Sequence, residues 1–349
     1  LIRLAEQDPD RRVRIAAAEA IVAMGVRNPA SAKALMELWR RTDHAGEAWT
    51  LIEAIGVTGS DPSDFTQFLV ETAEGKREGE IPYAAMRALA KLDQSGNTAA
   101  PLFVRLFKDK EVFGQGYGAD SMNHIAGREL QEMGPRSASG APVVAQLLAR
   151  GELKDADCIV MMDAFHVLQR YPAETKKVEP LLRTYLLGEV RPKGAEEQHI
   201  AKLQIAAAQA ILALHLGKDR ESEELLLSIL SGDKWLRDGK SIPRIGTYYP
   251  DPRLDAARAA GKLGPGFSAA LPHLRTLLDE AGKRHIDWME NEAAWAIAQI
   301  DHNDRDCIDH IDLSSHVRFY RSTDAAAKAL GRRSAPLMPQ ILSLVFGEL

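Results

Sequence analysis

The stretch DHNDRDCIDHID, from residue 301 to residue 312, has the best set of metal-binding side-chain types in the chain. His302, Cys307 and His310 are residue types that bind zinc, and several aspartates lie among them. An EF-hand is excluded, because its fifth and sixth positions need an oxygen ligand and a glycine but hold Arg305 and Asp306. The His and Cys spacing matches no established zinc pattern, so we expect a polar turn and an amphipathic helix here, with no metal.

Other catalytic motifs lack the context that their chemistry needs. GQGYG, at 114–118, is not followed by GxxxxGK[ST] and follows no predicted strand, so a phosphate loop is excluded. The 10 histidines are scattered, and no Ser-His-Asp or Cys-His arrangement is identifiable. Cys158 and Cys307 form no CxxC motif, which fits a reducing compartment and favours the cytoplasm. We predict no catalytic residues, no cofactor and no bound metal.

Composition indicates a helical protein. Of the 349 residues, 45% are apolar but only 6% are aromatic, and alanine is abundant, which points to closely packed helices. No run of eighteen apolar residues occurs, so no membrane span is expected. The net charge of -5 argues against sequence-independent binding to nucleic acid. The chain begins and ends inside apolar runs, LIRLAEQDPD and APLMPQILSLVFGEL, so we expect it to be a piece of a longer protein.

A nine-residue segment that carries no catalytic side chain returns along the whole chain, at intervals of 33 to 49 residues. Its copies are AAEAIVAMG at 17, LIEAIGVTG at 51, AMRALAKLD at 85, AGRELQEMG at 126, AFHVLQRYP at 164, AAQAILALH at 207, AARAAGKLG at 256, AAWAIAQID at 293 and AAKALGRRS at 326.

The spacing of apolar residues predicts that each copy is a helix. Counting the residues of the segment as positions 1 to 9, position 1 is alanine in every copy except Leu51. Position 5 is always aliphatic: Ile21, Ile55, Leu89, Leu130, Leu168, Ile211, Ala260, Ile297 and Leu330. In the first copy, Val13, Ala16, Ala17, Ala20, Ile21 and Met24 follow the i, i+3, i+4, i+7 pattern of one helical face. We therefore expect position 5 to be buried.

A second series of helices is predicted between these copies. APLFVRLF at 100–107, APVVAQLL at 141–148, LPHLRTLL at 271–278 and APLMPQIL at 335–342 each have a proline near the first helical turn, where a missing N–H costs nothing. Each repeat is then a helix A, a turn and a helix B, where helix B carries the nine-residue segment. One such pair cannot bury its apolar face alone, so the pairs are expected to stack into a solenoid.

The chain resembles the HEAT-repeat (armadillo-like) family, in particular the short bacterial repeats related to bilin lyases. The likeness lies in DPDRRVRIAAAEAIVAMG at 8–25, MGPRSASGAPVVAQLLARG at 133–151 and DPRLDAARAAGKLGPGFSAALPHLRTLLDEAG at 251–282. The resemblance covers the whole chain and implies one all-α, elongated domain over 1–349, an α-α superhelix of about nine hairpins. Copies five and six depart most, with Pro172 and His215 at position 9. No His-Glu pair of the related di-iron hydroxylases occurs.

The resemblance also implies that the B helices line a concave face. Position 3, which is mostly polar, would then face solvent: Glu19, Glu53, Arg87, Arg128, His166, Gln209, Arg258, Trp295 and Lys328. Neighbours one turn away extend this stripe, with Tyr83 and Lys91 beside Arg87, and Arg170 beside His166. We predict a basic groove formed by Tyr83, Arg87, Arg128, His166, Arg258, Trp295 and Lys328. The alternative is that this is an ordinary solvated face.

Three insertions are expected between helix A and helix B of a repeat, at 112–121, 190–198 and 232–252. In a solenoid such turns lie along one edge. The third is the richest in interface-forming residues and gives an edge-loop site of Trp235, Arg237, Arg244, Tyr248 and Tyr249. The alternative is a loop that only covers the core.

We therefore interpret the chain as a non-catalytic scaffold that binds a protein partner, or other domains of the same polypeptide, through the groove and the edge loop. Two alternatives remain open. One is a lyase- or chaperone-type enzyme that acts on a cofactor, which would need a buried polar cluster or a pocket. The other is nucleic-acid or phosphate binding along the basic groove.

Overall fold

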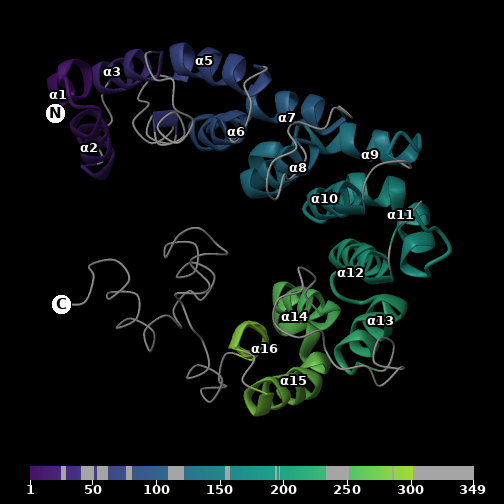
Figure 1. Cartoon of the computed structure of the whole chain (residues 1–349). Helices are drawn as coiled ribbons and strands as arrows, with labels where there is room; N and C mark the ends of the chain where they lie inside the picture. Colours follow the sequence, from purple (N-terminus) through teal and green to yellow (C-terminus); the bar gives the residue numbers. More distant parts are fainter. Residues whose placement is uncertain are drawn as a thin grey trace. The chain divides into compact units, whose positions relative to one another are not determined.

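The computed structural model describes residues 1–24, 29–40, 51–52, 62–75, 81–108, 122–153, 158–192, 195, 197–232, 251–284 and 287–301. Throughout these ranges the regular structure is helical, and none of these residues lies in a β-strand. The all-α class expected from the sequence is therefore confirmed for this part of the chain (Figure 1).

The contacts divide the chain into unit 1, Leu1–Val178, and unit 2, Glu179–Leu349. Unit 1 contains α1 (Ile2–Gln7), α2 (Arg11–Ala23), α3 (Pro29–Arg40), α5 (Pro62–Glu74), α6 (Ile81–Leu92), α7 (Ala99–Lys108), α8 (Met122–Met133), η1 (Gly134–Ser137), α9 (Ala141–Ala149) and α10 (Cys158–Leu168). The boundary falls within α11 (Pro172–Leu186). Unit 2 contains α12 (Glu197–Leu214), α13 (Arg220–Leu230), α14 (Pro252–Leu263), η2 (Gly264–Ala270), α15 (Leu271–Arg284) and α16 (Asp287–Ile300).

The repeated segments coincide with helices. Seven of the nine copies begin in α2, α6, α8, α10, α12, α14 and α16, which we call the B helices. The copies at 51 and 326 lie largely or wholly outside the described residues. The second series also forms helices, since α7, α9 and α15 begin within one residue of the predicted starts. We call α3, α5, α7, α9, α11, α13 and α15 the A helices.

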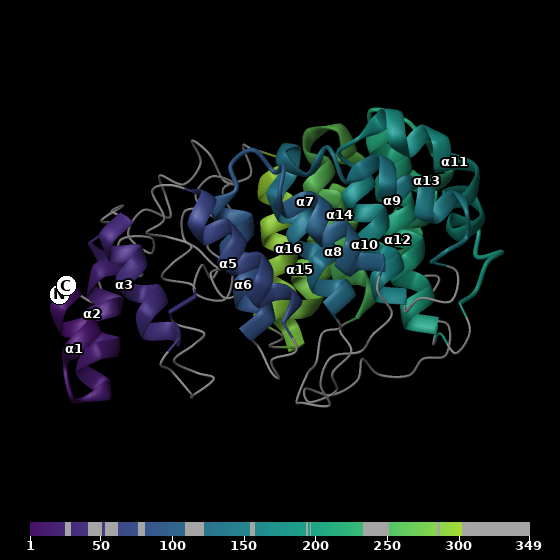
Figure 2. The same cartoon turned by 90° about the horizontal axis from the view of Figure 1, so that it is seen from above.

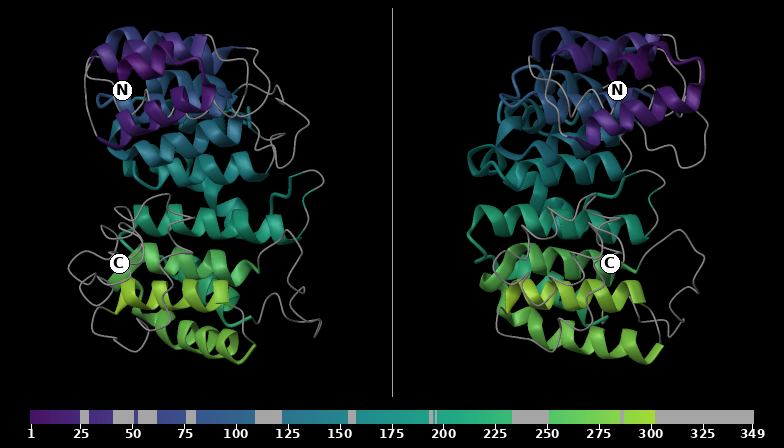
Figure 3. Two further views of the ribbon diagram at one scale, coloured as in Figure 1. Left: turned by 60° about the vertical axis from the view of Figure 1, so that its left-hand side comes forward. Right: turned by 90° about the vertical axis from the view of Figure 1, so that its left-hand side faces the viewer.

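Within each unit, helices of the same series lie side by side. In unit 1, α6, α8 and α10 form one row and α5, α7 and α9 form the other (Figure 1). Helix α8 contacts α6 and α10 of its own row and α7 of the other row. In unit 2, α14 contacts α12 and α16 of its own row and α13 of the other row. Figure 3 shows the helices of unit 2, in green and yellow, running alongside one another.

The core follows the repeat. All seven described residues at position 5 are buried, as the sequence predicts: Ile21, Leu89, Leu130, Leu168, Ile211, Ala260 and Ile297. Position 1 of the same helices is a buried alanine in every case. These small residues let the backbones of neighbouring helices approach closely. Ile55 and Leu330 lie outside the described residues.

Polar side chains fix the joints between the helices. The carboxylate of Asp93 accepts hydrogen bonds from the backbone N–H groups of Ser95, Gly96, Thr98 and Ala99, and so caps the start of α7. Burial alone would raise the pKa of Asp93, but these hydrogen bonds lower it below its ordinary value. Arg136 of the next repeat donates to the carbonyl oxygens of Ala90 and Asp93. This turn is therefore held from its own repeat and from the following one.

Two amides perform equivalent tasks in the two units. Asn123, near the start of α8, donates to the carbonyl oxygens of Leu106 and Phe107 at the end of α7. Gln204 of α12 donates to the carbonyl oxygen of Leu186 at the end of α11. Both B helices thus satisfy carbonyl groups that the preceding A helix leaves without an intrahelical donor.

The helix bounds agree with the predicted insertions. The segment 112–121 lies between α7 and α8. The segments 190–198 and 232–252 fall between α11 and α12 and between α13 and α14, but reach into the first residues of α12 and α14. Residues 112–121 and 233–250 are outside the described residues, so their placement on a common edge stays a prediction.

Truncating a position-5 side chain should destabilise the fold strongly. Leu130 is fully buried, so Leu130→Ala should lower the free energy of unfolding by about 2–5 kcal/mol through lost burial and a residual cavity. Chemical denaturation followed by far-ultraviolet circular dichroism measures this change. Glu132→Ala, at an exposed position of the same helix, should change it by about 0.5 kcal/mol at most. Equal effects of the two variants would show that the repeat positions are misassigned.

Candidate binding face

The predicted groove residues fall on different units. Tyr83 and Arg87 of α6, Arg128 of α8 and His166 of α10 lie in unit 1, and all four are half-buried. Since α8 contacts both α6 and α10, the structure brings these four onto adjacent helices. Arg258 of α14 and Trp295 of α16 lie in unit 2, and Lys328 lies outside the described residues.

The expectation that position 3 always faces solvent is wrong for two residues. Trp295 is 3% exposed and Gln209 is also buried, so neither side chain is available to a ligand. Trp295 has the largest side chain at position 3, and burying its aromatic ring removes a large apolar surface from water. Trp295 therefore does not belong to a binding groove.

The other predicted site and the rejected metal candidate cannot be placed. The edge-loop residues Trp235, Arg237, Arg244, Tyr248 and Tyr249 lie outside the described residues, as do His302, Cys307 and His310. Among the residues that are described, no group of three or more His, Cys, Asp or Glu side chains is arranged to hold a metal ion.

A polar cluster joins α8 to α10. His124 Nδ1 lies 2.6 Å from Asp163 Oδ2, and Gln131 Nε2 donates to Asp163 Oδ1 at 2.9 Å. Asp163 is 5% exposed, whereas His124 and Gln131 are half-buried. Gly127 makes this approach possible, because a Cβ there would lie 2.6 Å from the Cβ of Asp163. The cluster is thus built into a close contact between two B helices.

Burial dominates the electrostatics of this cluster. It raises the pKa of Asp163 above the ordinary value, although the hydrogen bond from His124, the hydrogen bond from Gln131 and the charge of Arg128 all act to lower it. Arg128, one of the predicted groove residues, therefore serves at least partly to compensate a buried carboxyl group in the next helix.

An equivalent arrangement occurs in unit 2. Arg258 Nη2 of α14 donates to Glu292 Oε1 of α16 at 2.9 Å, and Arg258 also lies 3.4 Å from Asp255 of its own helix. Asp255 in turn lies 3.7 Å from Lys202 of α12. Glu292 is buried. Arg258, expected to face a groove ligand, belongs to a chain of ion pairs across three B helices.

Two of these acids, Asp163 and Glu292, follow one rule of position, whereas Asp255 pairs with Lys202 from outside the repeated segment. Asp163, Asp255 and Glu292 each stand immediately before position 1, which we call position 0. The cation at position 3 of the preceding B helix, Arg128 or Arg258, lies next to Asp163 or Glu292 respectively. The buried acids at position 0 were not predicted, because every polar residue was expected to face solvent. An acidic residue directly before the small residue at position 1, with a cation at position 3 of the previous copy, was the available signal.

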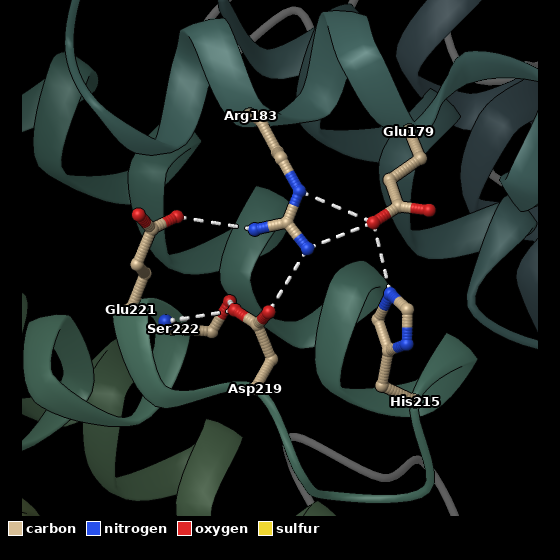
Figure 4. Close-up of polar contacts among 6 residues, drawn as sticks. All are labelled: Glu179, Arg183, His215, Asp219, Glu221 and Ser222. Carbon is tan, nitrogen blue, oxygen red and sulfur yellow. Dashed lines mark hydrogen bonds and ion pairs between the residues drawn. The ribbon is translucent and has the colours of Figure 1, made fainter.

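A separate ion-pair network lies at the end of α11 in unit 2 (Figure 4). The guanidinium of Arg183 donates to Glu179, Asp219 and Glu221, and His215 Nε2 lies 2.8 Å from the same Glu179 oxygen. The hydrogen bond with His215 is the main cause that lowers the pKa of Glu179. Asp219 also caps α13 through the N–H and hydroxyl of Ser222. Because one guanidinium joins three carboxylates, this network ties α11 to the start of α13.

Unit 1 also contains a cleft whose lining differs from these polar clusters. A cleft of about 400 Å³ lies between α9 and α11 and is lined by Pro142, Val143, Ala145, Gln146, Ala149, Glu174 and Lys177. Its walls are mostly aliphatic, and Lys177 pairs with Glu174 at 2.7 Å. This lining offers apolar contact but no set of groups suited to acid–base or nucleophilic chemistry.

Comparison with known proteins gives no relative: no protein-family model, no curated protein and no solved structure matches the chain. None of the described helices is long and apolar enough to cross a bilayer. Functional interpretation therefore depends on the contacts described above.

The raised pKa of Asp163 predicts a measurable pH dependence. A carboxyl group whose pKa is raised by folding stabilises the fold fully below its ordinary pKa of 3.8, and this contribution is lost as the pH rises through the raised value. Asp163→Asn removes this titration. Urea unfolding between about pH 4 and pH 7 should show that the wild type loses more stability than Asp163→Asn as the pH rises. The exposed Glu132→Gln should run parallel to the wild type, and a parallel curve for Asp163→Asn would refute the assignment.

The pair of Arg258 and Glu292 predicts a rescue. Arg258→Met leaves the buried Glu292 carboxylate without its cation and should lower the free energy of unfolding by about 3 kcal/mol, because Arg258 is only 30% exposed. Adding Glu292→Gln should restore most of the loss. Thermal and chemical unfolding of the two single variants and the double variant measure this coupling. Additive effects would mean that the ion pair contributes little.

Proposed function

We propose that the chain is a HEAT-like α-solenoid of about nine helical hairpins, wound as a right-handed superhelix, that acts as a non-catalytic scaffold for a protein partner. One observation carries the proposal: within each unit, B helices contact the B helices of neighbouring repeats and the A helices beside them. Such nearest-neighbour contact is what a stack of hairpins produces. The burial of position 5 in every described copy supports the same architecture.

The polar clusters also support a scaffold. His124 with Asp163, Arg258 with Glu292, and Arg183 with its three carboxylates all connect one helix to another. In each cluster, the pairing of opposite charges or hydrogen-bonding groups compensates a charge that is buried or partly buried between helices. A catalytic interpretation would instead need a nucleophile or a general base beside a substrate-sized cavity.

The B-helix face of unit 1, formed by α6, α8 and α10, is the part of the predicted groove that we propose for binding. Its half-buried members are Tyr83, Arg87 and His166, and at position 7 the exposed Lys91 and Arg170 flank the exposed Glu132. Arg128 is also half-buried here, but its charge already acts on the buried Asp163. The exposed charges at position 7, two cations and one acid, therefore sum to a positive charge.

An acidic peptide segment of a partner protein is the ligand that this chemistry fits. Arginine presents a planar fork that suits carboxylates and stacks on aromatic rings, and tyrosine and histidine add polar tips with apolar bodies. An extended segment would contact several B helices in turn, as concave solenoid surfaces commonly do. Such binding should weaken as salt is added, because exposed charges are screened over about 8 Å at physiological ionic strength.

The proposal is tested with defined peptides. A fluorescent glutamate-rich peptide should bind and a lysine-rich peptide of equal length should not, with fluorescence anisotropy as the measurement. Lys91→Glu combined with Arg170→Glu should weaken binding of the acidic peptide by about tenfold or more, since two favourable charge contacts become repulsive. The melting temperature should hardly change, because both side chains are exposed.

The matched control is Lys176→Glu, an exposed lysine of α11 in the A-helix series, which should leave the affinity unchanged apart from a small effect of net charge. Hydrogen exchange of the bound protein should show protection in α6, α8 and α10. Equal binding of both peptides, or protection confined to the A helices, would remove this face as the binding site.

A further inference from the structure

The turn between α12 and α13, residues 215–219, carries an exposed leucine in a conformation that leucine rarely adopts. Leu216 is 87% exposed, the largest exposed fraction among the large apolar residues that the structure describes. Its φ is +53°, and no other non-glycine residue in the described part of the chain has a positive φ. Both features cost stability, because the Cβ crowds the backbone in this region and water surrounds the apolar side chain.

Glycine takes the equivalent place at the ends of two other B helices. At the end of α12, the N–H of Gly217 donates to the carbonyl oxygen of Leu212, which forms a Schellman-type helix end with Leu216 as its left-handed residue. After α8 and α14 the left-handed residues are Gly134 and Gly264, with φ of +57° and +65°. The turn therefore requires a left-handed residue but not a leucine. A strained leucine with so little packing points to a role outside the fold.

Polar contacts hold this leucine in position. His215, next to it in the chain, lies 2.8 Å from Glu179 of α11, and Asp219, at the other end of the turn, lies 2.9 Å from Arg183 of the same helix (Figure 4). Both ends of the turn are thus tied to α11. A side chain on such a support loses little conformational entropy when it enters a binding site.

The cleft between α9 and α11 in unit 1 can accept an exposed leucine. Figure 2 shows these two helices as neighbours in the teal part of the chain. The cleft has a volume of about 400 Å³, and its lining includes the exposed apolar residues Pro142, Val143 and Ala149. A leucine side chain that entered the cleft would leave water together with these walls. Leu216 does not fill this cleft in its own molecule, because it is 87% exposed.

The charges beside the leucine and beside the cleft are opposite in sign. Arg183 is joined to three carboxylates, so the acids outnumber the lysine and arginine side chains even when the exposed Lys218 of the turn is counted. At the cleft, Lys177 and Glu174 belong to the lining, and the exposed Lys176 is next to Lys177 in the chain. The turn is therefore acidic and the cleft basic, which favours their approach.

We propose that Leu216 of one copy of the chain inserts into the cleft between α9 and α11 of a second copy. The leucine and the cleft are different surfaces, so the contact is head to tail, and copies are added until a ring closes or a filament grows. One leucine with its charged surround makes a small interface, so the association should be weak, with a dissociation constant of about micromolar or higher. This surface is separate from the B-helix face proposed for peptide binding.

Sedimentation velocity up to about 1 mM protein tests this contact with one variant on each side. The wild type should form larger species as its concentration rises. Leu216→Gly, which removes the inserting side chain, and Val143→Glu, which places an acid in the apolar cleft, should each stay monomeric. Leu216→Gly should raise the melting temperature by about 1–2 °C, because glycine adopts positive φ without strain. Val143→Glu should hardly change it, since Val143 is 39% exposed.

Mixing the two variants supplies the decisive readout. Leu216→Gly keeps an intact cleft and Val143→Glu keeps an intact leucine, so an equimolar mixture should form a 1:1 dimer that cannot grow further. The matched control is Leu187→Ala, which removes another exposed leucine of unit 2 and should associate as the wild type does. A wild type that stays monomeric, a mixture that stays monomeric, or association that survives in either single variant would overturn the proposal.

Discussion

Each interior B helix has two opposite sides that neighbouring helices must cover. Positions 2 and 6 meet the following B helix, and positions 0 and 4 meet the preceding one, as Gly127 with Asp163 and Gly261 with Ala296 illustrate. At these two contacts glycine is needed, because a Cβ at Gly127 would lie 2.6 Å from the Cβ of Asp163 and a Cβ at Gly261 would lie 3.1 Å from the Cα of Ala296. The stability of one helical hairpin therefore depends on the helices beside it, as the proposed repeat architecture requires.

Buried acids at position 0 are the costly part of this arrangement. A carboxylate removed from water is tolerated only with a cation or hydrogen-bond donors nearby, and Asp163 and Glu292 obtain these from the preceding B helix. An apolar residue in the same place, such as Ile125 in α8, would give more stability for less cost. The charged arrangement makes helix packing specific. If one helix shifted along its neighbour, the buried acid would lose its cation and remain an uncompensated charge.

The sequence was sufficient for the helices and their buried face, because both follow from a periodicity that every copy shares. The burial of Leu130 and Ile297, and the starts of α7, α9 and α15, were predicted in this way. It was not sufficient for the polar positions. Periodicity separates a buried stripe from a polar one, but it does not tell whether a polar residue faces water or a neighbouring helix. Arg258 and Trp295 were assigned to solvent for this reason, although Arg258 pairs with Glu292 and Trp295 is buried.

This distinction decides where a ligand can be recognised. A cation that compensates a buried carboxyl group in the next helix is held in place by that carboxyl group, and recruiting it to a ligand would leave the acid uncompensated. In unit 2 the cations Lys202 and Arg258 lie in one continuous chain with Asp255 and Glu292. In unit 1, α8 has Ile125 at position 0, but its position 4 is the buried Glu129, on the flank that meets α6. Recognition of a charged partner is therefore expected to be least costly at cations whose side chains are exposed, such as Lys91 and Arg170.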